Sequence, residues 1–86
     1  MAATKGTLLD RVRITWTAPA GATGYEVYRS TTNNTATAVK ITAMDVTGSI
    51  FEDLTAISGT TYYYWIKAKN TGGTSGFSAV ASGFRP

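Results

Sequence analysis

The sequence predicts an all-β fold in which about seven antiparallel strands form a two-layer sandwich. Three observations support this prediction. The chain is rich in Thr, Ser and Gly, and only 15% of its 86 residues are charged, which suits a pleated sheet because β-branched side chains fit it well. Apolar and polar residues alternate with a period of two in several runs separated by turn residues. No segment indicates a helix.

The first half of the chain is predicted to form four strands. Apolar and polar residues alternate over residues 12–17, and Pro and Gly within residues 18–24 predict the loop that ends this strand. A second alternating run covers residues 25–30 and leads into a polar stretch. Two short strands follow, one around residues 39–41 and one at residues 50–53.

The longest alternating run, from Thr61 to Asn70, separates an inner from an outer face. A Gly-rich loop then leads to a last strand at residues 78–84. The alternation in this run and in the earlier strands assigns six residues to the structural core: Trp16, Tyr25, Val27, Tyr62, Tyr64 and Ile66.

The composition excludes most catalytic and metal chemistry. The chain has no Cys and no His, so it lacks disulfides, thiolate and imidazole catalysis and the commonest ligands of zinc. Its acidic residues are expected at solvated strand edges and turns: Asp10, Glu26, Asp45, Glu52 and Asp53. Adjacent residues of a strand point to opposite faces, so Glu52 and Asp53 are not expected to chelate a metal together. We predict no catalytic residue, no cofactor and no metal site.

The charge pattern also restricts the partners. The net charge is +3, but the eight Lys and Arg residues are scattered along the sequence, which argues against a nucleic-acid partner. No apolar run is long enough to insert into a membrane. The first residues lack the features of a signal peptide.

Three segments together resemble fibronectin type III domains. They are Trp16, residues 24–29, and residues 59–70 with the following Gly72 and Ser75. The resemblance covers residues 12–84 and is greatest to Thr- and Gly-rich tandem modules of large secreted or cell-surface bacterial proteins, including polysaccharide-degrading enzymes. It implies an immunoglobulin-like sandwich of fibronectin type III topology. The absence of a Cys pair and the early position of the Trp distinguish the chain from true immunoglobulin domains.

The resemblance implies a role for Tyr62 as the tyrosine-corner residue, its hydroxyl bonded to the backbone a few residues upstream. Family members usually carry a Leu and a Pro shortly before this tyrosine, where the chain has Ala56 and Ser58. We therefore expect Leu54 or Ile57 to fill the bottom of the core. Residues 1–86 are predicted to be one domain whose first strand is short or truncated.

The outer face of the longest strand is the candidate ligand or interdomain surface. Alternation places Tyr63, Trp65 and Lys67 there, and the family pairing brings Glu26 and Tyr28 alongside. Three interpretations remain open at this stage. In the first, the aliphatic stems of Lys and Arg side chains cover the aromatic rings, with a Glu26–Lys67 ion pair alongside. In the second, a neighbouring domain packs on the rings, and in the third, a carbohydrate or peptide ligand binds to them.

The sequence thus favours a non-catalytic structural or spacer module of a secreted or cell-surface bacterial protein, with a role such as adhesion. Neighbouring domains are the expected partners, and the domain itself is expected to be a monomer. The alternative is a carbohydrate- or protein-binding module that uses the aromatic face or the end loops. An enzyme and an engineered binding scaffold are further alternatives.

Overall fold

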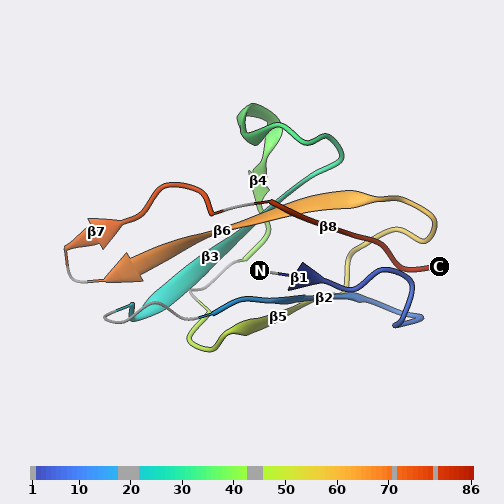
Figure 1. Ribbon diagram of the computed structural model, residues 1–86, viewed down its shortest axis with the longest axis horizontal. Coiled ribbons are helices and arrows are strands. Elements are labelled where there is room, and N and C mark those ends of the chain that lie inside the picture. Colours follow the sequence, from blue (N-terminus) through green and yellow to red (C-terminus); the bar gives the residue numbers. More distant parts are fainter. Residues whose placement is uncertain (1, 18–21, 43–45, 71, 79) are drawn as a thin grey trace.

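Two antiparallel sheets face each other in the computed structural model of the protein, which describes residues 2–17, 22–42, 46–70, 72–78 and 80–86 (Figure 1). The predicted all-β sandwich is confirmed. Asp45 and residues 18–21 of the expected first loop lie outside the described residues. Within the described ranges, no helix has the length and apolarity needed to cross a membrane.

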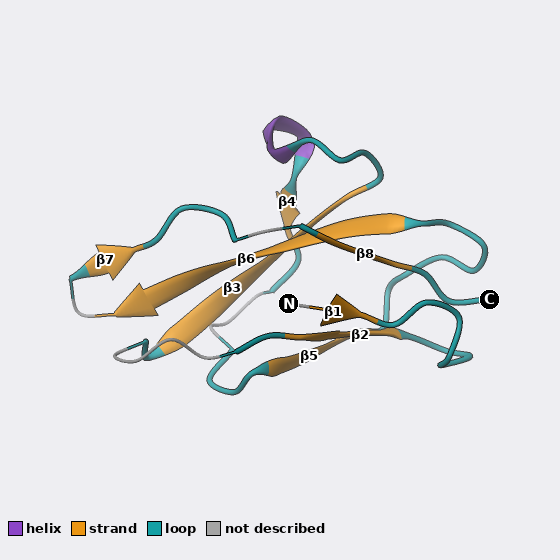
Figure 2. Cartoon of the chain, in the orientation of Figure 1, coloured by secondary structure: helices purple, strands orange, loops and turns teal. Residues whose placement is uncertain are grey.

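One sheet has three strands in the order β1-β2-β5, and the other has five, with β4-β3-β6-β7 in a row and β8 also paired with β6. The strands are β1 Ala2–Ala3, β2 Val12–Thr15, β3 Gly24–Ser30, β4 Val39–Lys40, β5 Ile50–Asp53, β6 Tyr62–Asn70, β7 Gly73–Thr74 and β8 Ala81–Gly83. Figure 2 shows one short helical turn among the described residues, η1 (Thr35–Thr37), between β3 and β4. The sequence did not indicate this turn, which Asn34 caps by accepting a hydrogen bond from the Ala36 amide at 2.9 Å.

The core lies between the two sheets and contains all six residues that the alternation assigned to it. The edge of the Trp16 ring packs on Tyr25 with centroids 5.2 Å apart. Tyr62 also forms the bond expected of a tyrosine corner, because its hydroxyl accepts a hydrogen bond from the Ile57 amide at 3.1 Å.

The expectation that Leu54 or Ile57 fills the bottom of the core is wrong. Their side chains are 66% and 64% exposed, whereas Ala56 is buried in the core. The bond between the Ile57 amide and the Tyr62 hydroxyl holds the backbone close to the core here. Only the small Ala56 side chain enters, and the Arg29 guanidinium covers the Tyr62 ring at 4.5 Å from its centroid.

The first and last strands join the two sheets along one side of the sandwich. Lys5 and Phe84 form a parallel bridge, supported by bonds from the Gly6 amide to the Phe84 carbonyl (2.9 Å) and from the Phe84 amide to the Thr4 carbonyl (3.1 Å). A Cβ atom on Gly83 would lie 2.7 Å from the Thr4 carbonyl oxygen. Glycine is required there because no side chain fits between the two backbones.

Candidate functional site

The outer face of the five-stranded sheet gathers aromatic and charged side chains from β3, β4, β6 and the segment that follows β7. We call this set the lysine–aromatic face. Its members are Glu26, Tyr28, Lys40, Trp65, Lys67, Lys69 and Phe77.

Strand register brings these residues together. In the antiparallel pairing of β3 with β6, Glu26 lies opposite Lys67 and Tyr28 lies opposite Trp65. On its other side, Tyr28 lies opposite Lys40 of β4. Because directly opposed residues of neighbouring strands share a face, three separate segments of the sequence place their side chains on one surface.

Trp65 is buried, although we expected its ring to be exposed. Its exposed fraction is 3%, because Phe77 packs against it with ring centroids 6.3 Å apart. Phe77 also meets Tyr28 edge-on at 5.1 Å and is itself 37% exposed. Alternation therefore gave the correct side of the sheet for Trp65 but did not reveal that a later segment covers it.

Two serines hold Phe77 in place. The amides of Ser75 and Ser78 donate to the carbonyls of Ala68 and Ile66 on β6, at 2.8 and 2.9 Å. Their hydroxyls accept bonds from the amides of the same two residues, at 2.9 Å (Ala68) and 3.0 Å (Ile66). The segment thus stays bonded to β6 without regular backbone pairing, and Phe77 between the serines lies over the outer face.

Glu26 is the carboxylate at the centre of this face. The Tyr28 hydroxyl donates to Oε1 at 2.9 Å, while the ammonium groups of Lys40 and Lys69 lie 3.2 and 3.7 Å from Oε2. The bond from Tyr28 and the two ammonium groups outweigh partial burial and hold the pKa of Glu26 below its usual value.

The Glu26–Lys67 ion pair, which the first of the three interpretations included, does not form, and Glu26 pairs with Lys40 and Lys69. The Lys67 ammonium lies over two rings instead, 4.3 Å from the centroid of Phe77 and 5.2 Å from that of Tyr28. Such cation–π contacts favour a cation through the ring quadrupole and leave its charge in place.

Tyr63 lies apart from the other residues of the candidate surface. It shares the outer face, but it is opposite Ser30 on β3 and Ser82 on β8. Within the described part of the chain, the ring contacts of the lysine–aromatic face involve Tyr28, Trp65 and Phe77. The structure therefore joins Glu26, Tyr28, Trp65 and Lys67, and leaves Tyr63 beside small side chains.

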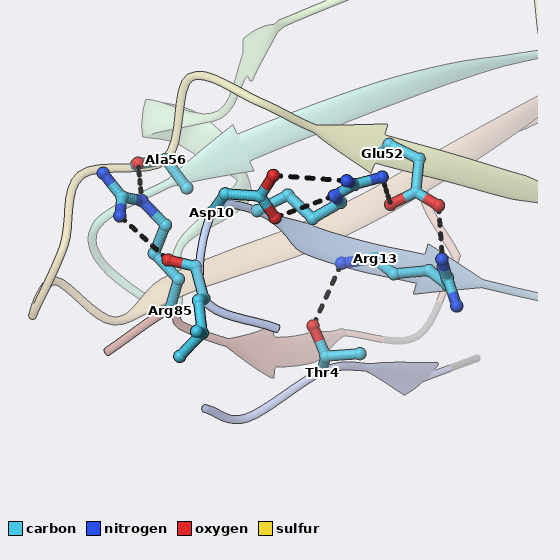
Figure 3. Close-up of polar contacts among 8 residues, drawn as sticks. Thr4, Asp10, Arg13, Glu52, Ala56 and Arg85 are labelled. Carbon is cyan, nitrogen blue, oxygen red and sulfur yellow. Dashed lines mark hydrogen bonds and ion pairs between the residues drawn. The ribbon is translucent and has the colours of Figure 1, made fainter. Parts of the chain in front are cut away.

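The charges on the three-stranded sheet neutralise one another (Figure 3). Arg11 donates to Asp10 at 3.0 Å, which lowers the pKa of that carboxyl group, and Arg13 donates to Glu52 at 2.7 Å. Glu52 faces outward and the adjacent Asp53 faces inward, as expected for strand neighbours. Within the described ranges, no three acidic side chains gather as a metal site would require.

The expectation that Asp53 lies at a solvated edge is wrong. It is 2% exposed and accepts hydrogen bonds from the Tyr64 hydroxyl at 2.7 Å, from Arg29 Nη1 at 2.9 Å and from the Thr55 hydroxyl at 2.8 Å. Burial raises the pKa of Asp53, but these bonds outweigh it and the pKa lies below its usual value. Burial, together with the Asp53 carboxylate, raises the pKa of Tyr64. This network is structural because it lies inside the sandwich.

Alternation along residues 61–70 also assigned Lys69 to this face. Phe77 and Lys40 were not predicted as members of the surface, because they lie outside the two strands whose alternation defined it. The buried pair of Arg29 and Asp53 was not predicted either. The alternation did contain a signal for it. Arg29 lies two residues after Val27 and four after Tyr25 on the same strand, so its side chain points to the core side of the sheet.

The family model for the fibronectin type III domain matches residues 4–84. The chain belongs to this family. Its topology agrees, since a three-stranded sheet packs on a larger sheet that contains the tyrosine-corner strand β6. No curated protein matches the chain.

Two solved structures illustrate the likeness of this fibronectin type III domain to others. An Fn3-like protein from Clostridium thermocellum is 30% identical, with a TM-score of 0.86 over 99% of this chain and 86% of that one. The pectate lyase Pel3 from Pectobacterium carotovorum is 26% identical, with a TM-score of 0.81 over 94% of this chain but only 25% of that one. Fibronectin type III domains are generally non-catalytic and commonly act as modules of larger proteins, as in this lyase.

Proposed function

We propose that this fibronectin type III domain is a structural module that holds the neighbouring domains of a secreted or cell-surface bacterial protein at a fixed separation. The observation that carries the proposal is the parallel bridge between Lys5 and Phe84. The first and last strands run side by side in the same direction, so the chain enters at one end of this pair and leaves at the other. A module with this geometry separates the domains attached to it.

Contacts at both ends of the chain support the proposal. Ala2 pairs with Thr15 in the sheet. At the other end (Figure 1), the Pro86 carbonyl accepts a bond from the Ser58 hydroxyl at 2.6 Å. Arg85 donates to the carbonyls of Ala56 at 2.7 Å and Leu9 at 3.1 Å (Figure 3). Anchored ends allow the fold to fix the distance between attached domains.

The absence of native Cys allows a direct test. Ala2→Cys and Pro86→Cys, labelled with a donor and an acceptor dye, report the end-to-end distance by single-molecule energy transfer. We expect one narrow distance distribution that persists until the domain unfolds in denaturant. A control pair, Thr35→Cys and Thr61→Cys on exposed positions, reports unfolding of the sandwich alone. Loss of the end-to-end signal at a lower denaturant concentration than the control contradicts a spacer role.

A second candidate function is a carbohydrate- or protein-binding module. The exposed Phe77 ring beside three lysines on one sheet face favours it. Because Trp65 is buried, its large ring is not available to a ligand. This candidate function therefore depends on the charged side chains and on Phe77.

A further inference from the structure

The net positive charge of the domain is concentrated on one face. On the three-stranded sheet, Arg11 and Arg13 are paired with Asp10 and Glu52. Between the sheets, Arg29 is paired with Asp53. On the lysine–aromatic face, by contrast, three lysines share the surface with a single carboxylate, Glu26, which pairs with two of them. Among the described residues, this face therefore carries an excess of two positive charges out of a chain total of +3.

The three ammonium groups lie on one face although their residues come from two strands, Lys40 from β4 and both Lys67 and Lys69 from β6. Lys40 and Lys69 approach the same oxygen of Glu26, at 3.2 and 3.7 Å. Tyr28 links this pair to Lys67, since its hydroxyl binds Glu26 and its ring lies under the Lys67 ammonium. The side chains of Lys40 and Lys69 are 40% and 32% exposed, so part of each side chain lies at the surface.

Phe77 adds an apolar surface next to these cations. Its ring is 37% exposed and lies 4.3 Å from the Lys67 ammonium. A polymer that combines carboxylates with apolar C–H ring faces is complementary to this arrangement, because ammonium groups attract the carboxylates and an exposed aromatic ring packs on the C–H face.

We propose that the lysine–aromatic face binds carboxylated polysaccharides. Lys40, Lys67 and Lys69 contact the carboxylates of successive sugars, and Phe77 packs against one sugar ring. The proposal rests on the second candidate function and not on the spacer role, because neither residue of the Lys5–Phe84 bridge belongs to this face.

The same observations disfavour a phosphate polymer. Tight binding of single-stranded nucleic acid uses several successive stacking rings and many phosphate contacts, whereas Trp65 is 3% exposed beneath Phe77. Arginine matches phosphate best through its planar fork. The arginines of this chain are engaged elsewhere, three with carboxylates and Arg85 with backbone carbonyls.

The test is titration of the ¹⁵N-labelled 86-residue chain with polygalacturonate oligosaccharides, followed by NMR chemical shifts. Fully methyl-esterified oligosaccharides provide the matched control, because they keep the sugar backbone and lose the charge. We expect shifts in β3, β6 and around Phe77 with the acidic ligand alone, and weaker binding at higher ionic strength. No shifts with the acidic ligand, or equal shifts with both ligands, overturn the proposal.

Matched variants separate the local surface from overall charge. Lys67→Gln should weaken binding about two- to fivefold, the range for losing one exposed ion pair. Lys5→Gln removes the same charge from an exposed site outside the face and should change the affinity by less than about twofold. Equal losses in the two variants, or tighter binding of a single-stranded oligonucleotide than of polygalacturonate, contradict the proposal. Because neither experiment measures the end-to-end distance, failure here is distinct from failure of the spacer function.

Discussion

Replacing Asp53 with Ala should remove a large part of the stability of the domain. The carboxylate is 2% exposed and satisfies Tyr64, Arg29 and Thr55 at distances from 2.7 to 2.9 Å. Without it, the Arg29 guanidinium, whose side chain is only 23% exposed, keeps the Tyr62 ring and the Thr55 hydroxyl but loses its counter-ion.

The expected cost is about 3–5 kcal/mol, the range for removing one partner of a buried ion pair. A domain of this size has a total stability of roughly 4–13 kcal/mol at 0.05–0.15 kcal/mol per residue. Asp53→Ala therefore removes at least about a fifth of this stability. Asp53→Asn keeps the shape and one acceptor oxygen, so it should lose less.

Urea denaturation followed by tryptophan fluorescence measures the effect. With an m-value of about 1–3 kcal/mol per M, the midpoint of Asp53→Ala should fall by at least about 1 M. A double-mutant cycle with Arg29→Met should give a coupling energy of about 1–3 kcal/mol. A loss below about 1 kcal/mol for Asp53→Ala, or a coupling near zero, refutes the assignment of Asp53 as an internal anchor.

Three further predictions follow from the same structure. Tyr62→Phe removes the acceptor of the Ile57 amide and should cost about 1–3 kcal/mol in chemical denaturation; an unchanged midpoint would show that this bond contributes nothing. Gly83→Ala places a Cβ 2.7 Å from a backbone oxygen and should cost about 1–3 kcal/mol, whereas Gly48→Ala, which meets nothing within 4 Å, should change stability far less in the same thermal-melting assay. Because the pKa of Asp53 is lowered on folding, its contribution is complete above the unfolded carboxyl pKa of about 3.9 and is lost as the pH falls below the folded value. Stability measured from pH 6 to pH 2 should therefore decline more steeply for the wild type than for Asp53→Asn.

Strand phase was predictable because it depends on local geometry. Side chains of a strand alternate between faces whatever the strand packs against, so Val27, Tyr62 and Tyr64 were assigned to the core before any contact was known. The same reasoning failed for Leu54 and Ile57, which lie in a turn without period-two alternation. There, the hydrogen bond to Tyr62 decides which side chains point inward.

Only part of the candidate site could be predicted in this way. Alternation of side chains along each strand identified the side of the sheet that carries Tyr28, Trp65 and Lys67. It gave no information on what covers that side. Phe77 covers Trp65 because the hydroxyls of Ser75 and Ser78 accept hydrogen bonds from β6, and this segment shows no alternating pattern.

By itself, the sequence determined the sandwich, its core strands and the absence of cysteine and histidine chemistry, since all of these depend on composition or on local alternation. The tyrosine corner was implied by the resemblance to fibronectin type III domains. Tertiary structure alone decided where charge is buried and where it accumulates. Folding buries Asp53 with Arg29 inside the sandwich, and it brings Lys40 of β4 to the face that carries Glu26, Lys67 and Lys69. Charge–charge interactions depend on distance in space, and the pairing of distant strands sets that distance.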